Sequence, residues 1–328
     1  TLTLRASIDA TETNHVPPFP AAFAKAENYH RMGRVYNWEV QHQVVYGDFP
    51  GGLKDLKTEN QEVRDAMFYV YARWMSLVDF DGFRIDTLKH VEHEFWQDFA
   101  PRIRAHAKSL GKDKFLMFGE AFNGIDDQLA PYTAPNEVDS VFYFSQMYAI
   151  KGAFRGGSSQ YLHDLHVQRP TRYNNTPQPD GAGQAPTKLL VNFMDNHDVA
   201  RFLNGGHPVE ELHTALTFLY TEDGIPCLYY GTEQDFDGGN DPNNREDLWN
   251  TGYKTNGATF QWIKQLTTLR KNYEPLRRGD MRWQEWTLDS EGPGILAFER
   301  YTDSENVLVV INTSPDSKTK TVKTSFGA

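Results

Sequence analysis

The chain has 328 residues, enough for one large domain and a small one. Its hydrophobic fraction of 39% and charged fraction of 23% are typical of globular proteins and exclude a disordered or membrane-embedded class. The net charge of -11 argues against nucleic acid and anionic membranes, which attract basic surfaces, whereas a neutral polymer is compatible with it. Because Cys227 is the only cysteine, no disulfide framework can form, and we expect this thiol to pack in the core.

Residues 1–57 have no clear helical or strand periodicity. Two clusters of turn-forming residues, 14–18 and 47–52, interrupt this region. We therefore expect a long irregular excursion, of the kind that usually serves function or forms a subdomain.

From residue 58 onward, helical and strand patterns alternate. Thr58 and Gln61 have the spacing of a capping box, which predicts a helix start. The buried stripe of this helix is expected to comprise Val63, Met67, Val70, Tyr71, Trp74 and Val78. Further helices are expected at 93–110, 209–223 and 259–273, and strands at 81–86, 115–122, 138–144, 189–194 and 225–230.

Continuous apolar strands that alternate with helices predict a parallel sheet buried on both faces, which closes most naturally as a β/α barrel. Residues 156–187 read as a long loop rich in Gly, Pro and Asn. From about residue 281 the pattern becomes strands alone, expected at 282–288, 294–301, 306–312 and 318–323. The predicted fold is α/β: a partial TIM (β/α)8 barrel, about strands 4 to 8, over residues 58–280, followed by the start of a small antiparallel β domain over 281–328. Three earlier strand–helix units would be needed to close such a barrel, so the sequence reads as a fragment.

Three acidic residues follow expected strands: Asp86, Glu120 and Asp198. The carboxyl ends of barrel strands meet at one mouth, where barrel active sites lie. Carboxylates brought together there suit glycoside hydrolysis, in which one attacks the anomeric carbon and another protonates the leaving oxygen. Arg84 projects from the same strand face as Asp86 and would keep it ionised. Each acid taken singly could instead be a structural ion-pair partner, a loop carboxylate or a helix cap.

Four segments resemble known motifs. GFRIDTLKH (82–90), FGEAF around Glu120 and FMDNHD ending at Asp198 resemble three of the four signature motifs of the α-amylase family of glycoside hydrolases. GGNDPNNRE (238–246) is similar to the sugar-binding loop after the last barrel strand of fungal-type α-amylases. The resemblance covers about residues 40–320 and implies an N-terminally truncated family member, with 1–57 as the remnant of a subdomain B.

The resemblance implies roles for the three acids. Asp86 would be the nucleophile, Glu120 the general acid/base and Asp198 the stabiliser of the transition state. The apolar strand before Glu120 suits an acid catalyst, because burial favours the protonated form.

The resemblance also implies substrate contacts. His197 would bind sugar hydroxyls, and Lys89 and His90 would lie on the leaving-group side. Asp241 and Arg245 would contact the outer glycone side. The alternatives are a structural histidine at His197, a solvated helix-start charge at Lys89 and a loop salt bridge between Asp241 and Arg245.

A structural Ca²⁺ is implied in the same way. Asp55, in GGLKDL, matches a carboxylate ligand of the family, and the backbone carbonyl of His90 matches another ligand. Asp55 could equally be a turn residue before the following helix.

The sequence therefore predicts a retaining hydrolase that cleaves α-1,4 links in starch-like polysaccharides or oligosaccharides. One alternative is a transglycosylase of the same superfamily, and another is a fragment that binds glucan or scaffolds a partner without catalysis. We expect no nucleic-acid or membrane partner and a monomer in the full-length form. The polymeric substrate implies an extracellular or periplasmic location, although no signal peptide is recognisable.

Overall fold

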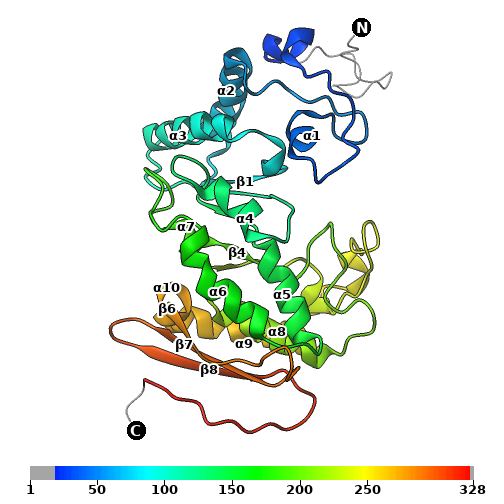
Figure 1. The fold of residues 1–328 in the computed structure, drawn as a ribbon, viewed down its shortest axis with the longest axis vertical. Coiled ribbons are helices and arrows are strands. Elements are labelled where there is room, and N and C mark those ends of the chain that lie inside the picture. Colours follow the sequence, from blue (N-terminus) through cyan, green and yellow to red (C-terminus); the bar gives the residue numbers. More distant parts are fainter. Residues whose placement is uncertain (1–18, 326–328) are drawn as a thin grey trace. The chain divides into compact units, whose positions relative to one another are not determined.

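The computed structural model describes residues 19–325, which form two compact units (Figure 1). The first unit contains residues 19–122, Asp127–Val141 and Tyr173–Pro186. The second contains Asn123–Asp126, Phe142–Arg172 and the chain from Thr187 onward. The turn cluster expected at 14–18 lies outside the described residues.

A parallel sheet of three strands organises the first unit. Its order is β1 (Gly82–Ile85), β2 (Leu116–Gly119) and β3 (Ser140–Val141). β1 and β2 pair from Gly82 opposite Leu116 to Ile85 opposite Gly119. The strands predicted at 81–86 and 115–122 are confirmed in shortened form, and their register brings the residues after β1 and β2 to the same sheet edge.

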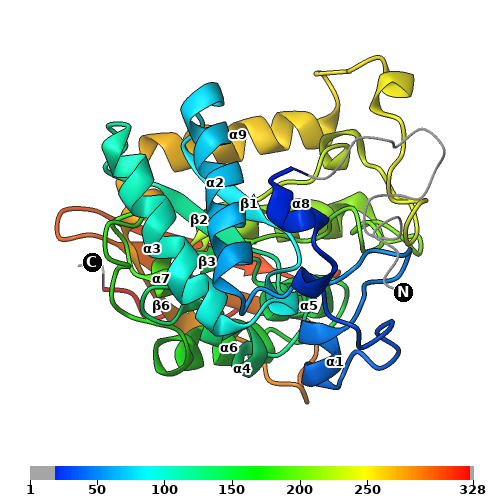
Figure 2. The ribbon, with the colours of Figure 1, turned by 90° about the horizontal axis from the view of Figure 1, so that it is seen from above.

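Two long helices of this unit, α2 (Gln61–Val78) and α3 (His93–Ser109), lie side by side (Figures 1 and 2). The predicted capping box is wrong, because the N-cap is Asn60, whose side chain accepts a hydrogen bond from the Glu62 N–H. The Thr58 hydroxyl is unavailable for capping, since it donates to the carboxylate of Glu92.

The buried stripe of α2 also differs from the prediction. The buried residues are Val63, Ala66, Ala72 and Met75. Trp74 and Val78 are exposed. His106 of α3 hydrogen-bonds the Ala72 carbonyl at 3.0 Å, so the small side chains of this face allow α3 to approach closely. By contrast, α3 buries Phe95, Phe99 and Ile103 as predicted, and ends before Gly111 with its left-handed φ of 82°.

The described part of the excursion, residues 19–57, is irregular as predicted. It holds two short 3₁₀ turns, η2 (Ala21–Ala24) and η3 (Ala26–Asn28), and one short helix, α1 (Gln41–Tyr46). Isolated bridges from Tyr29 to Leu56 and from Arg34 to Asp48 close it upon itself.

The second unit contains two short strands that pair in parallel, β4 (Val191–Asn192) and β5 (Ile225–Pro226). Phe142 also bridges Val191 in parallel. The predicted strand at 138–144 is shorter than expected because helix α5 (Phe144–Phe154) begins at once. The helices predicted at 209–223 and 259–273 are confirmed as α8 (Val209–Thr221) and α9 (Ala258–Asn272).

The loop predicted at 156–187 is wrong over its first half. Helix α6 (Gln160–Arg172) occupies it and buries Leu162, Leu165 and Arg169. A one-turn helix, α7 (Pro186–Leu189), closes the segment. Helical spacing of three buried side chains outweighs the Pro and Gly residues that suggested a loop.

An antiparallel sheet ends the described chain. After α10 (Glu274–Arg278) come β6 (Asp280–Glu285), β7 (Ile295–Tyr301) and β8 (Asn306–Asn312), in that order in the sheet (Figure 1). The prediction of a fourth strand at 318–323 is wrong. These Lys- and Thr-rich residues are mostly exposed and do not pair with any strand. Parallel strands with intervening helices, followed by this sheet, confirm the α/β class and the β domain. Over residues 19–325 the sheets do not form a closed barrel, and the numbering of strands 4 to 8 stays a prediction.

Candidate active site

Asp86 lies directly after β1. The next residue, Thr87, has a left-handed φ of 51°, which is rare for a β-branched residue and turns the chain sharply into the 3₁₀ turn η4 (Leu88–His90). The Thr87 N–H donates to Asp86 Oδ1 at 3.1 Å. The Asp86 side chain is 69% exposed, so its carboxylate is presented to an incoming ligand.

Glu120 lies directly after β2 and is the buried counterpart of Asp86, with a side chain only 8% exposed. Its N–H donates to the Ile85 carbonyl at 2.8 Å, and its own carbonyl accepts from the Leu88 N–H at 2.8 Å. Backbone hydrogen bonds on both sides of Asp86 therefore connect it to Glu120. The two acids lie at the same edge of the sheet, as their positions after neighbouring strands predicted.

Arg84 connects the two carboxylates. Its Nη1 lies 2.9 Å from Asp86 Oδ1, and its Nη2 donates to Glu120 Oε2. The first contact was predicted from the R-x-D spacing, whereas the second joins neighbouring strands and has no signal in the local sequence. A guanidinium beside a carboxylate favours its ionised form. The contact with Arg84 therefore acts against the apolar strand before Glu120, which was expected to favour the protonated form.

Gly119 provides the close approach that this arrangement needs. A Cβ at this position would lie 2.6 Å from Leu88 Cδ2 and 2.9 Å from Leu88 Cβ. Leu88 is fully buried, so it has little room to move. The glycine before Glu120 is therefore required for η4 to pack on β2.

Lys89 and His90 belong to η4, the 3₁₀ turn that follows Asp86 and Thr87. Lys89 Nζ donates to the Phe122 carbonyl at 2.6 Å, and burial lowers the pKa of Lys89 against the opposing charge of Glu120. His90 Nδ1 hydrogen-bonds the Val44 carbonyl at 3.0 Å, and burial together with the Lys89 charge lowers the pKa of His90. Since the Val44 carbonyl can only accept, Nδ1 is the donor in this hydrogen bond.

Two aromatic residues beside His90 were not predicted. Trp38 and Phe49 each contact its ring edge-on, at centroid distances of 5.7 and 5.4 Å. Both belong to the irregular excursion, whose sequence has no periodicity that would single out either ring.

In the second unit, Asp198 is the centre of a cluster of exposed charges. His197 Nε2 lies 3.2 Å from Asp198 Oδ2, and Arg245 Nη2 lies 3.5 Å from Asp198 Oδ1. Arg245 Nε also pairs with Asp241 Oδ1 at 3.0 Å. The structure therefore brings together the four residues that the sequence predicted from two separate motifs.

Buried polar residues hold this cluster in place. Asn244 Nδ2 donates to the carbonyls of Asn196 and Val199, at 3.2 and 2.9 Å. Arg201, which is fully buried, pairs with Glu246 and lies 4.0 Å above the Tyr229 ring. Sequence reasoning missed these supports because each joins segments far apart in the chain.

Asp55, the expected calcium ligand, is already engaged. Its Oδ2 lies 2.6 Å from His30 Nδ1, and its N–H donates to Asp48. Burial raises the pKa of Asp55 to about 6, although His30 opposes the shift. Between residues 19 and 325, no three His, Cys, Asp or Glu side chains gather in a way that could hold a metal ion. The described residues therefore do not fit a complete calcium site, and calcium stays a prediction resting on Asp55 and the His90 carbonyl.

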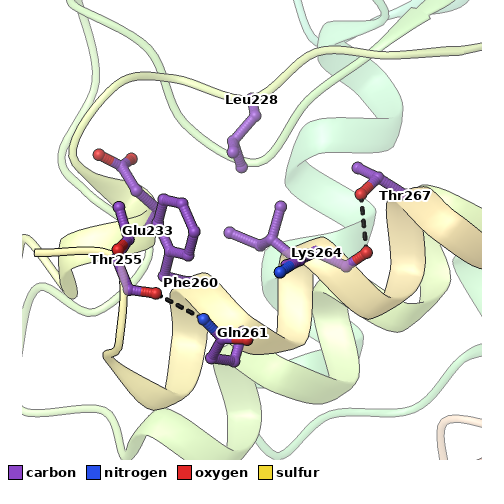
Figure 3. Close-up of a pocket in the computed structure, with 8 residues that line it drawn as sticks. Leu228, Glu233, Thr255, Phe260, Gln261, Lys264 and Thr267 are labelled. Atoms are coloured by element: carbon purple, nitrogen blue, oxygen red, sulfur yellow. Dashed lines mark hydrogen bonds between the residues drawn. The ribbon is translucent and has the colours of Figure 1, made fainter.

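A hollow of about 600 Å³ lies between α9 and the segment after β5 (Figure 3). Its lining is mostly apolar and includes Leu228, Phe260 and Ile263. The Glu233 carboxylate at its margin accepts a hydrogen bond from the Gly231 N–H. None of the predicted site residues lines it, so it is not a candidate for the chemistry. Within the described residues, no helix is long and apolar enough to cross a membrane.

The family model described as "Alpha amylase, catalytic domain" matches residues 12–283 of this chain. That match covers the great majority of the sequence. The chain belongs to the α-amylase family.

Relatives within the α-amylase family include both bacterial and fungal proteins. The chain is 33% identical to a "Beta/alpha-amylase" of Paenibacillus polymyxa over 92% of its length, and 32% identical to an "Alpha-amylase" of Streptomyces lividans over 84%. It spans 24% and 32% of the length of these two relatives.

Solved structures of the α-amylase family are also similar. An Anoxybacillus α-amylase matches with a TM-score of 0.76 and 30% identity, covering 89% of this chain and 60% of the other. A Geobacillus thermoleovorans α-amylase complexed with acarbose matches with a TM-score of 0.75 and 28% identity, covering 90% and 62%. A cyclomaltodextrin glucanotransferase matches with a TM-score of 0.76 and 27% identity, covering 92% and 58%.

Proposed function

We propose that this chain carries the chemistry of a retaining glycoside hydrolase that cleaves α-1,4-glucosidic bonds of starch-like glucans. The observation that carries the proposal is the pair Asp86 and Glu120, which follow neighbouring parallel strands and share Arg84. The α-amylase relatives support the reaction class, and the acarbose complex of a similar structure supports a glucan-like ligand.

In the first step, Asp86 would attack the anomeric carbon while Glu120 protonates the departing glycosidic oxygen. The C1–O bond to the leaving sugar breaks and an ester between C1 and Asp86 forms. To act as an acid, Glu120 has to carry a proton before this step. A protonated Glu120 interacts more weakly with Arg84, so the guanidinium would then pair mainly with Asp86. The exposed carboxylate of Asp86 and the buried carboxylate of Glu120 fit this division of roles.

In the second step, Glu120 would take a proton from water, and the resulting hydroxide would displace Asp86 from C1. Two displacements at the same carbon retain the anomeric configuration. We assign Asp198 to stabilisation of the positively charged transition state, and His197, Asp241 and Arg245 to contacts with sugar hydroxyls. Lys89 and His90 would contact the leaving sugar.

Transfer to a sugar acceptor is the second candidate reaction. A similar solved structure is a glucanotransferase, and a relative from Thermoanaerobacter pseudethanolicus is a "Cyclomaltodextrinase". Transfer uses the same carboxylates and differs only in which hydroxyl attacks the glycosyl-enzyme.

We also propose that the protein binds a structural Ca²⁺, is a monomer and acts outside the cytoplasm. The first two proposals follow from the family, and the third follows from the polymeric substrate.

The test compares reducing-sugar release from soluble starch by the full polypeptide and two variants. Asp86→Asn removes the nucleophile and should abolish release. Asp81→Asn is the matched control, because Asp81 is an exposed acid at the other end of the same strand, paired with Lys112 at 2.6 Å; it should retain full activity. Equal release by wild type and Asp86→Asn would overturn the assignment, and glucan binding without release by the wild type would favour the non-catalytic alternative.

A further inference from the structure

We propose that Lys151 is a positioning residue for Asp198: its ammonium group holds the Asp198 loop, residues 195–202, in the shape that the reaction needs. The inference rests on the proposed function. It adds to that function a residue of helix α5, which lies outside all four sequence motifs.

The Asp198 loop is closed at its two ends. Asp195 Oδ2 accepts a hydrogen bond from the Phe202 N–H at 2.7 Å, and both residues are buried. Between them Asp198 is exposed, and its N–H donates to Asn196 Oδ1 at 2.9 Å. The loop therefore presents the Asp198 carboxylate from between two buried ends, and the backbone between those ends decides where the carboxylate lies.

Two cations at the C-terminal end of α5 hold this backbone. Lys151 Nζ donates to the Ala200 carbonyl at 2.8 Å, two residues after Asp198. Arg155, the C-cap residue of α5, donates to the carbonyls of the next two loop residues. Three consecutive carbonyls of the loop thus accept hydrogen bonds from one helix end, and the contact of Lys151 is the one closest in sequence to Asp198.

Helix α5 is a well-anchored support for these contacts. It buries Met147, Ile150 and Phe154. It also packs against β4, the strand that leads into the Asp198 loop. A helix anchored on the strand before the loop can fix the loop relative to that strand.

The charge of Lys151 is matched by a buried carboxylate. Burial lowers the pKa of Lys151 to about 8, and Asp195 opposes this shift whereas Arg155 adds to it. These two residues are the charged groups that face Lys151, since Glu211 of α8 acts on Arg155 instead. Burial raises the pKa of Asp195, and Arg201, Lys151 and Arg155 act against that shift. Lys151 is therefore charged near neutral pH and loses its charge in mildly alkaline solution.

Loss of this charge would weaken two interactions at once. A neutral amine is a poorer donor to the Ala200 carbonyl, and it no longer attracts Asp195. The Asp198 loop then loses a fixed point two residues from Asp198. The carboxylate becomes less well placed toward the positive charge that develops at the anomeric carbon, so activity should fall as Lys151 is deprotonated.

The alternative is that Lys151 only stabilises the C-terminal end of α5, where a cation interacts favourably with the helix dipole. Such a role would change the stability of the protein, and its effect on activity would not depend on Asp198. The substrate α-maltotriosyl fluoride separates the two roles, because its leaving group is fluoride and needs no acid. Ionisation of Glu120 therefore does not limit kcat/KM for this substrate at alkaline pH.

The experiment measures kcat/KM for α-maltotriosyl fluoride in the full polypeptide at about pH 6.5 and about pH 9.5. Lys151→Met should lower kcat/KM about tenfold at the lower pH, as expected for the loss of one charged hydrogen bond. At the higher pH it should lie within about twofold of the wild type, whose lysine is then also neutral. Lys151→Arg keeps its charge, so it should restore most of the activity at the lower pH and exceed the wild type at the higher pH.

A double-variant comparison tests whether Lys151 acts through Asp198. In the Asp198→Asn background, Lys151→Met should change kcat/KM by less than about twofold, because the carboxylate that Lys151 positions is already absent. Lys188→Met is the matched control: it removes an exposed lysine of the same unit, paired with Asp280 at 2.6 Å, and should leave both pH values unchanged.

Three results would overturn the proposal: no loss in Lys151→Met, an equal loss at both pH values, or a full tenfold loss in the Asp198→Asn background. If Lys151→Met does not fold, Lys151→Gln keeps a hydrogen-bond donor without the charge and gives the same comparison. Failure of the proposed function itself would appear separately, as undiminished turnover of the fluoride by Asp86→Asn.

Discussion

The guanidinium of Arg84 lies 2.9 Å from the carboxylate of Asp86 and, through its other terminal nitrogen, donates to Glu120. One guanidinium thus forms ion pairs with two carboxylates at the ends of neighbouring strands, of which one is exposed and the other is buried. The planar fork of an arginine can make both contacts at once, whereas a lysine ammonium is a single point of charge.

Arg84→Lys should therefore lower kcat by about 30- to 160-fold, because loss of a charged hydrogen bond costs roughly 2–3 kcal/mol. Arg84→Met should lower kcat further. The measurement is kcat with α-maltotriosyl fluoride, with thermal melting as the folding control. Full activity of Arg84→Lys would show that the shared contact is dispensable.

Gly119→Ala should destabilise the first unit by about 1–3 kcal/mol, since the added methyl group overlaps buried Leu88. The backbone of Glu120 moves with it, so activity should fall as well. Urea unfolding and starch hydrolysis measure the two effects. Gly152→Ala is the control: no atom lies within 4 Å of the added Cβ, and a helix-interior alanine should be neutral or stabilising by up to about 1 kcal/mol.

Arg300 should be a stability residue without a catalytic role. It is buried, and its guanidinium donates to the carbonyls of Thr221 and Gly279 at 2.7 and 2.8 Å, which anchors β7 to the end of α8. Arg300→Met should cost about 2–4 kcal/mol, because buried carbonyls lose their partners, while kcat at low temperature stays unchanged. Lys188→Met, which removes only an exposed pair with Asp280, should change unfolding by less than about 1 kcal/mol. Equal effects of the two substitutions in urea unfolding would contradict this.

His93 should make the stability of the first unit depend on pH. Its hydrogen bond to Glu137, 2.9 Å from Nδ1 to Oε2, raises the pKa of His93 together with the Glu137 charge, against the effect of burial. A histidine with a raised pKa in the folded state contributes fully below its ordinary pKa of about 6.5, and the contribution is lost as the pH rises through the folded-state pKa. Urea midpoints measured from pH 6 to pH 8.5 should therefore converge for the wild type and His93→Gln. If the difference between the two urea midpoints stayed constant across this pH range, the ion pair between His93 and Glu137 could not be its cause.

The acids of the candidate site were predictable from the sequence because strand periodicity and strand ends fix where Asp86 and Glu120 lie. The second contact of Arg84 and the rings of Trp38 and Phe49 were not, since each depends on segments distant in the chain. Local sequence patterns also gave a wrong prediction where a side chain bonds a residue distant in the chain in place of the local backbone. Thr58 has the spacing of a helix cap, yet its hydroxyl donates to Glu92.

Apolar periodicity was similarly ambiguous when a helix carried two apolar faces. In α2 the face with Ala66 and Ala72 is buried, because small side chains permit close packing, and the larger Trp74 remains exposed. In α6, Pro170 and the flanking glycines concealed a helix that tertiary burial of Leu162 and Leu165 stabilises. Strand ends were therefore better predicted than helix faces.

The most direct test of the account is to trap the covalent intermediate. Glu120→Gln would lack the base that we propose for the second step, whereas fluoride needs no acid to leave. We therefore expect α-maltotriosyl fluoride to load the variant and deglycosylation to stall. Peptide mass spectrometry should then find one maltotriosyl group on the peptide that contains Asp86, and none in the Asp86→Asn, Glu120→Gln double variant. An adduct on another residue, or the release of a product with inverted anomeric configuration by the wild type, would contradict Asp86 as the nucleophile.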